Sequence, residues 1–200
     1  MKKLILAPFM LFSICLFLSC GGNDSSADTS KDSVINKDTI NAMRADTPAS
    51  VNKMKKTVDK DASEFASKAA SGGMMEVELG RIAQQKAASQ RVKDFGAMMV
   101  QDHTAANDDL KSRVSSLDVA LPSMVNDEDK KEMDKLSKKY GKDFDKAYMN
   151  MMLDDHKKDV AEFRKAADKC TEPSLKDFAS KTLPVLEKHL DSAKAITGKH

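Results

Sequence analysis

The chain has 200 residues, with 33 basic and 31 acidic side chains and a formal net charge of +2. Because the two signs of charge are interleaved, the sequence predicts no basic face of the kind that binds nucleic acid. Aromatic residues make up 5% of the chain, Trp is absent and Met occurs 13 times. This composition is typical of a helical core filled by Leu, Ala and Met, and it argues against a sheet.

The first residues have the pattern of an export signal. Lys2 and Lys3 are followed by an apolar run from Leu4 to Leu18 and then by Ser19-Cys20. The run is shorter than the ~20 residues of a membrane-spanning helix. We therefore predict a signal peptide over residues 1–19.

The end of this segment resembles a bacterial lipobox. Phe17-Leu18-Ser19-Cys20 places a small residue before the cysteine, and Gly21-Gly22 follows it. The resemblance implies that Cys20 is lipidated and becomes the first residue of the mature protein. The expected location is the cell envelope, with the lipid anchor in the outer membrane and the domain in the periplasm. The alternative is a signal peptide without lipidation.

Cysteine usage predicts no intramolecular disulfide, because Cys15 leaves with the signal, Cys20 is acylated and Cys170 has no partner. Residues 20–58 are rich in Ser, Asp, Asn, Thr and Lys and hold too few apolar residues to fold alone. We predict a disordered tether there and a folded domain over residues 59–197.

The folded domain is predicted to be all-α, because each long segment carries one apolar stripe at helical spacing. A very short first connection makes the first two helices antiparallel, and the Gly72-Gly73 pair indicates a kink, a close approach or a break. Two short hairpins around one long connection form a ferritin-like four-helix bundle. The expected helices cover residues 61–87, 89–117, 127–140 (a short helix in the long connection), 143–169 and 171–196.

Each long helix carries one ionisable residue at the centre of its apolar stripe and near its middle. A buried polar group needs a partner, and residues midway along aligned helices meet at one level. One carboxylate and three imidazoles are a suitable set of ligands for Zn, Fe, Mn or Cu. A structural hydrogen-bonded layer, or helices out of register, would explain the same pattern. The candidate metal ligands are Glu76, His103, His156 and His189.

Two neighbouring features are open to more than one interpretation. Asp102 and Asp155 each precede a stripe histidine, and they either accept hydrogen bonds from imidazoles on adjacent helices or face water, which we favour. Met99 and Met152 lie one turn before the histidines, where thioethers would favour copper, although methionine at this spacing is usually core.

Residues 61–196 resemble the ferritin-like family catalogued as domain of unknown function 4142, whose members are often described as outer-membrane proteins. The resemblance implies a four-helix fold in an exported protein and no established activity. The chain lacks the Glu-x-x-His pairs of di-iron proteins, so a mononuclear site or none fits better than a ferroxidase. The motifs that carry the resemblance are Phe95–His103, Phe144-Asp145-x-x-Tyr148, His156 and Leu183-Pro184-x-x-x-x-His189.

The sequence holds no Gly-x-Ser-x-Gly element and no phosphate loop, so an enzymatic role has little support. The leading hypothesis is an anchored lipoprotein whose bundle binds one transition metal, for metal handling or stress protection. The alternative is a non-enzymatic envelope interaction or structural module, in which the central Glu/His layer only fixes helix packing. Protein partners are not predicted.

Overall fold

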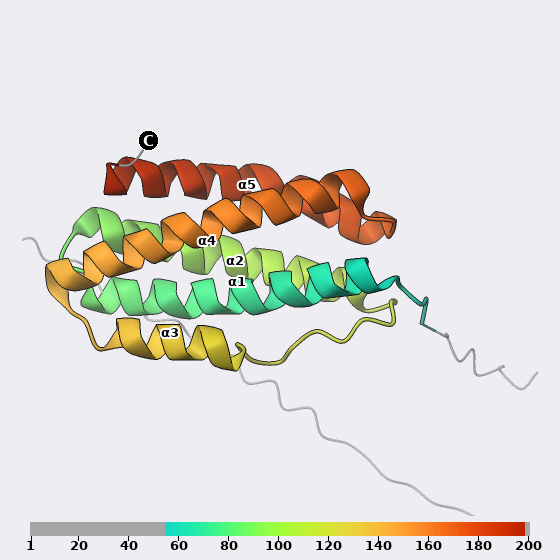
Figure 1. Ribbon diagram of the computed structural model, residues 1–200, viewed down its shortest axis with the longest axis horizontal. Helices are drawn as coiled ribbons and strands as arrows, with labels where there is room; N and C mark the ends of the chain where they lie inside the picture. The colour runs from blue at the N-terminus through green and yellow to red at the C-terminus, as the bar shows by residue number, and fades with distance from the viewer. Residues whose placement is uncertain (1–54, 199–200) are drawn as a thin grey trace, which may run out of the picture. The chain divides into compact units, whose positions relative to one another are not determined.

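The computed structural model describes residues 55–198, which form an all-α bundle as predicted (Figure 1). The predictions for the signal peptide, for Cys20 and for most of the tether lie outside the described residues. Within the described range, four long helices make the bundle and a short one lies in the long connection. The helices are α1 (Lys60–Lys86), α2 (Gln90–Val114), α3 (Asp127–Ser137), α4 (Gly141–Lys169) and α5 (Pro173–Thr197).

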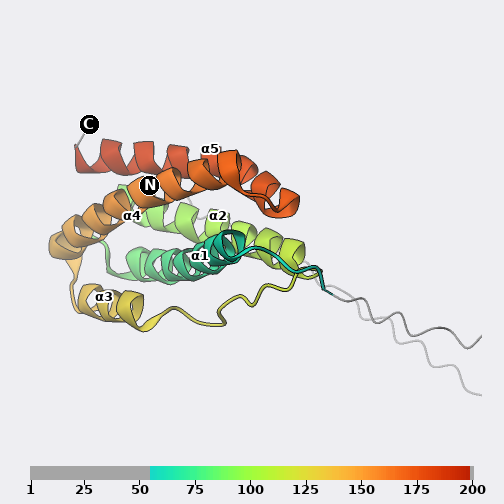
Figure 2. The same cartoon turned by 45° about the vertical axis from the view of Figure 1, so that its right-hand side comes forward.

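The helices are connected as two antiparallel hairpins joined by a crossover (Figures 1 and 2). Because the α2–α4 connection returns along the length of the bundle, α2 and α4 run in the same direction. Helix α1 packs against α2 and α4, and α5 packs against the same two helices. The four long helices therefore enclose one interior, and α3 covers α1 and α4 from outside.

The helices begin near the predicted residues because capping groups are present there. Asp59 is the N-cap of α1 and accepts a hydrogen bond from the Ala62 amide at 2.9 Å. Pro173 opens α5, where no amide donor is needed.

Two predicted helix ends were wrong. Helix α2 stops at Val114, three residues before Leu117, because the Leu117 amide folds back to the Val114 carbonyl at 2.9 Å.

The second difference concerns Gly141, which was predicted to end the short helix. Helix α3 instead ends at Ser137, and Gly141 begins α4 with φ of 60°. A positive φ is readily adopted by glycine, which has no Cβ. Gly141 therefore makes the reversal between the crossover and α4.

The α1–α2 turn is held by a residue of α4. Asp145 accepts hydrogen bonds from the backbone amides of Ala88 (3.0 Å) and Ser89 (2.9 Å). Ser89 is the N-cap of α2, but its own side chain makes no capping bond. The carboxylate of Asp145 thus satisfies two amides that the short turn leaves free.

The Gly72-Gly73 pair does not break α1, which is continuous from Lys60 to Lys86. The predicted close approach is found at Gly73, where an added Cβ would lie 2.5 Å from the Asn107 side chain of α2, and the two backbones approach about two turns later. A Cβ atom built on Gly80 would lie 2.5 Å from the carbonyl oxygen of Gly96, and one built on Gly96 would lie 2.8 Å from the carbonyl oxygen of Gly80. The two backbones touch at this crossing, which fixes α2 against α1 one turn beyond Glu76.

The apolar interior consists of two clusters, with polar residues between them along all four long helices. The first cluster lies toward the start of α1 and includes Ala62, Ala66, Ala70, Leu110, Val114, Val160, Phe163, Leu175 and Phe178. The second lies toward the α1–α2 turn and includes Leu79, Ala83, Phe95, Met99, Phe144, Tyr148, Met152 and Leu153. Among residues 55–198, no helix is both long enough and apolar enough to cross a membrane.

Candidate metal centre

The four residues predicted from the stripes come together between the two apolar clusters. Their exposed fractions are 2% for Glu76, 5% for His103 and 0% for both His156 and His189. The three imidazole centroids lie 5.2–5.7 Å apart. Each of the three histidines lies on a different long helix, so the packing of the bundle sets their positions.

The protons of two imidazoles are assigned by their hydrogen bonds. His156 Nδ1 lies 2.9 Å from the carbonyl oxygen of Met152, which can only accept, so Nδ1 carries the proton. His189 Nε2 lies 2.9 Å from the Asp102 carboxylate and donates to it in the same way. A neutral imidazole has one N–H, so in each ring that N–H is used in the hydrogen bond to Met152 or Asp102.

The remaining nitrogens of these rings face each other, with His156 Nε2 and His189 Nδ1 3.3 Å apart. Burial lowers the pKa of His156 and outweighs the charge of Glu76, which raises it; the nearby His103 lowers it further. Burial also lowers the pKa of His189, to about 4, although the bond to Asp102 raises it. Both rings are therefore neutral at pH 7, and two lone pairs point at one another with no proton between them.

Glu76 and His103 form a buried pair, with His103 Nδ1 donating to Glu76 Oε2 at 2.8 Å. Burial alone raises the pKa of Glu76, but His103 and His156 attract the carboxylate and bring the net pKa below its ordinary value. Burial alone lowers the pKa of His103, and the charge of Glu76 outweighs it and raises the pKa. The other atoms of this pair, Glu76 Oε1 and His103 Nε2, are buried without a hydrogen-bond partner.

The arrangement fits a metal ion better than a closed hydrogen-bond network. One ring nitrogen from each of the three histidines lies within 4.8 Å of the other two. Glu76 Oε1 is 3.4 Å from His156 Nε2, so a carboxylate borders the same space. A purely structural layer would satisfy its polar atoms, since a half-satisfied buried network is costly. A cation placed among these lone pairs would satisfy them together.

Asp102 corrects one sequence-based interpretation. We favoured water as its neighbour, but its carboxylate binds His189 across the α2–α5 interface. A carboxylate that accepts the outer N–H of an imidazole fixes the tautomer and turns the other nitrogen inward. Asp155 does not do this, and pairs with Lys158 of its own helix at 3.5 Å. Met99 and Met152 are fully buried in the second apolar cluster, as expected of core residues.

Asp159 belongs to the centre and was missed from the sequence. It lies three residues after His156 on α4, and its carboxylate, His156 and Glu76 offer ligand atoms within 4.8 Å of one another. Burial raises the pKa of Asp159 to about 9, and the negative charge of Glu76 adds to the effect. The signal that could have found it is the His-x-x-Asp spacing, which places both side chains on one helix face.

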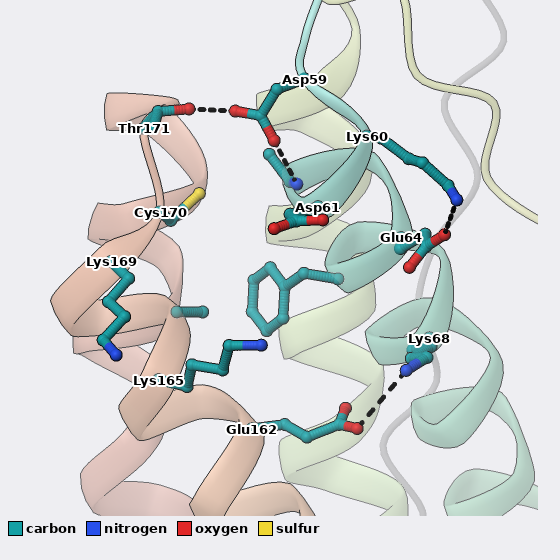
Figure 3. A pocket seen from close by; sticks show the side chains of 13 residues that line it. Asp59, Lys60, Asp61, Glu64, Lys68, Glu162, Lys165, Lys169, Cys170 and Thr171 are labelled. Carbon is teal, nitrogen blue, oxygen red and sulfur yellow. Dashed lines mark hydrogen bonds and ion pairs between the residues drawn. The ribbon is translucent and has the colours of Figure 1, made fainter.

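A small cavity lies beside the centre, and a larger pocket lies nearer the start of α1. A small cavity of about 90 Å³ is bordered by Glu76, His103, Asp159 and Glu162. A larger, open pocket of about 530 Å³ lies between the first turns of α1 and the end of α4 (Figure 3). Phe65 and alanines form its apolar part, and charged side chains such as Lys165 surround it.

Fold and centre together define a class: a helical bundle with one crossover, a short covering helix and a buried Glu/His layer. The chain belongs to the family described as domain of unknown function (DUF4142), whose model matches residues 47–196. It is also similar in structure to a DUF305 fragment from Deinococcus radiodurans, with a TM-score of 0.62 and 10% sequence identity. That similarity covers 72% of this chain and 99% of the other, and it concerns the fold alone. No curated protein matches the chain.

Proposed function

We propose that the chain is an exported, membrane-anchored lipoprotein whose bundle binds one transition-metal ion, for metal handling or stress protection in the envelope. The ligands are His103, His156, His189 and Glu76. The observation that carries the proposal is the 3.3 Å approach of His156 Nε2 to His189 Nδ1. Each of these rings donates its one N–H to another group, His156 to Met152 and His189 to Asp102. A cation between the two free nitrogens would therefore be stabilised by both lone pairs.

The chemistry of the ligand set narrows the choice of ion. Three imidazole nitrogens and a carboxylate oxygen are a common set for four-coordinate Zn²⁺. Cu²⁺ binds nitrogen ligands most tightly among the divalent first-row ions, and Fe²⁺ and Mn²⁺ bind less tightly. We therefore expect Cu²⁺ and Zn²⁺ to bind best.

Metal titration of the full-length chain tests the proposal. The protein is purified in detergent, stripped with a chelator that is then removed, and titrated with Zn²⁺ and Cu²⁺ by calorimetry. The expected result is about one ion per chain, as a set of four ligands around one position provides. Elemental analysis of protein purified without chelator reports the ion acquired in the cell.

Substitutions identify the ligands. The double variant H103A/H156A removes two of the four and is expected to lose more than about 100-fold in affinity, since second-shell changes alone cost 10–100-fold. H200A is the matched control, because it removes the one histidine that the proposal does not use. Binding that is absent in the wild type, or unchanged in the double variant, contradicts the proposal. It would favour the alternative of an interaction module with a purely structural layer.

The anchoring part of the proposal is supported by the lipobox-like Phe17–Cys20 segment and is tested separately. In cells labelled with a fatty acid, the wild-type chain is expected to take up label and fractionate with the outer membrane. C20A is expected to lose both properties, whereas C170A keeps them. Unlabelled wild-type protein in the soluble periplasmic fraction would leave an exported protein without an anchor.

A further inference from the structure

Helix α4 carries a line of ionisable residues that leads from the centre toward solvent. His156, Asp159 and Glu162 follow one another at intervals of three, which places them along one side of the helix. His156 is fully buried, Asp159 is partly buried, and the side chain of Glu162 is 48% exposed. The line therefore runs from the interior outward.

The small cavity follows the same line. It is bordered by Glu76 and His103 on the inner side and by Asp159 and Glu162 on α4. Two atoms of its inner wall, Glu76 Oε1 and His103 Nε2, are buried without a hydrogen-bond partner. With about 90 Å³ of space it can hold a few water molecules, since one occupies ~30 Å³ in the liquid. The cavity therefore provides space beside the two residues that carry these unpartnered atoms.

A surface ion pair lies where the small cavity and the open pocket share lining residues. Lys68 Nζ lies 3.6 Å from Glu162 Oε1, and both side chains border the small cavity and the open pocket alike. Figure 3 shows this pair bridging α1 and α4 at the edge of the pocket. Exposed ion pairs contribute ~0–1 kcal/mol, so thermal motion opens this one readily.

Two groups of ligand atoms share His156, namely His103/His156/His189 and Glu76/His156/Asp159. His156 Nδ1 is bonded to Met152, which leaves a single lone pair, on Nε2. One lone pair binds one ion, so the two groups cannot be filled at the same time. A single ion would therefore occupy one group at a time.

We propose that a divalent cation enters from the open pocket past Glu162, is first held by Asp159 with Glu76 and His156, and then passes to the three histidines. This inference rests on the proposed function. Asp159 is an entry ligand. Its carboxylate oxygen would replace a water molecule bound to the ion before the imidazole nitrogens complete the site. It therefore governs the rate of loading more than the final affinity.

Stopped-flow mixing of Zn²⁺ with the metal-free, full-length chain, followed by a competing chromogenic indicator, tests this route. In D159N we expect the association rate to fall by about tenfold or more, because the amide cannot release a proton and offer a carboxylate oxygen to the incoming ion. Dissociation slows similarly, so the equilibrium affinity stays within about threefold. E162Q is expected to slow loading by a smaller factor.

D154N is the matched control, because it makes the same carboxyl-to-amide change in the same helix at a side chain that is 67% exposed. It is expected to load at the wild-type rate. D159N loading as fast as D154N would overturn the inference, and so would D159N losing affinity only through faster dissociation. Circular dichroism verifies that each variant is folded. A wild-type chain that binds no Zn²⁺ would refute the proposed function and the route with it, whereas normal loading of D159N refutes the route alone.

Discussion

Single hydrogen bonds decide where the lone pairs of the centre point. The Asp102 carboxylate holds the Nε2 proton of His189, which leaves Nδ1 free to face His156. In D102A the imidazole can turn or change tautomer, and we expect Zn²⁺ affinity to fall by about 10–100-fold with the fold retained. Competition titration measures the change. D108A, at an exposed carboxylate of the same helix, is the control and should bind as the wild type does.

The raised pKa of Asp159 makes the stability of the metal-free chain depend on pH. Its folded pKa is about 9 and its ordinary value is 3.8, so between these values the folded chain keeps a proton that the unfolded chain releases. Stability therefore falls as pH rises across this range. His189 has the opposite effect, because its folded pKa of about 4 lies below 6.5 and adds stability as pH rises between the two. His103, with a raised pKa, reinforces the decline above pH 6.5.

Above pH 6.5 the decline caused by Asp159 is therefore no longer offset by His189. With chelator present, D159N is expected to be more stable than the wild type by several kcal/mol near pH 8.5 and about equal to it near pH 4. Thermal unfolding followed by circular dichroism across this range measures the gap. If the stabilities of D159N and the wild type changed in parallel at all pH values, Asp159 would be ionised in the folded chain.

Position in an apolar stripe was enough to predict the convergence of Glu76, His103, His156 and His189. Asp102 was named as a possible acceptor but not favoured, and Asp159 was missed, because their roles depend on relations between helices. The contact of Asp102 with His189 depends on how α2 and α5 pack, and sequence spacing carries no information on that. Asp159 borders a cavity that exists only once α1 and α4 are assembled.

At the level of helices, the α1–α2 crossing is the contact most sensitive to added volume. A Cβ at Gly80 would lie 2.5 Å from a backbone oxygen of α2, which cannot move aside as a flexible side chain can. G80A is expected to destabilise the chain by about 2–3 kcal/mol and to weaken metal binding, because Glu76 and His103 would move apart. Chemical denaturation and metal titration test both effects.

Gly72 provides the internal comparison for this prediction. It lies in the same helix, and a Cβ there would meet nothing within 4 Å. G72A should therefore stabilise the chain by about 0.5–1 kcal/mol through helix propensity alone. If G72A and G80A destabilised to the same degree, the crossing would not be a tight contact.

The helices themselves were largely predictable, because periodic stripes and capping residues determine them locally. What holds the helix ends together was less accessible. Asp145 closes the α1–α2 turn from 56 residues away along the chain, a contact that no local pattern indicates. Phe144-Asp145-x-x-Tyr148 was noted as a motif, and the structure shows that its Asp145 holds the α1–α2 turn.

For the molecule as a whole, the polar layer separates two apolar clusters, and a bound ion would tie all four long helices together between them. Binding only to the folded state stabilises by about 2.7 kcal/mol at a free-ion concentration 100 times Kd. We therefore expect Zn²⁺ to raise the melting temperature by several degrees. Replacing all four ligands with Leu or Met should retain or increase stability without metal and abolish the response. A response that persists in this variant would place the binding elsewhere.

Lys56 gives the described part of the chain a mechanical property. Its amide and carbonyl bond to Ser116 and Asp118 at 3.1 and 2.8 Å, and its ammonium reaches the buried Glu172 at 2.7 Å. Tension applied through the preceding residues would be borne first by this clasp, at the end of the bundle away from the α1–α2 turn. A pull on this end of the described chain would thus load these bonds before it strained the arrangement of the histidines.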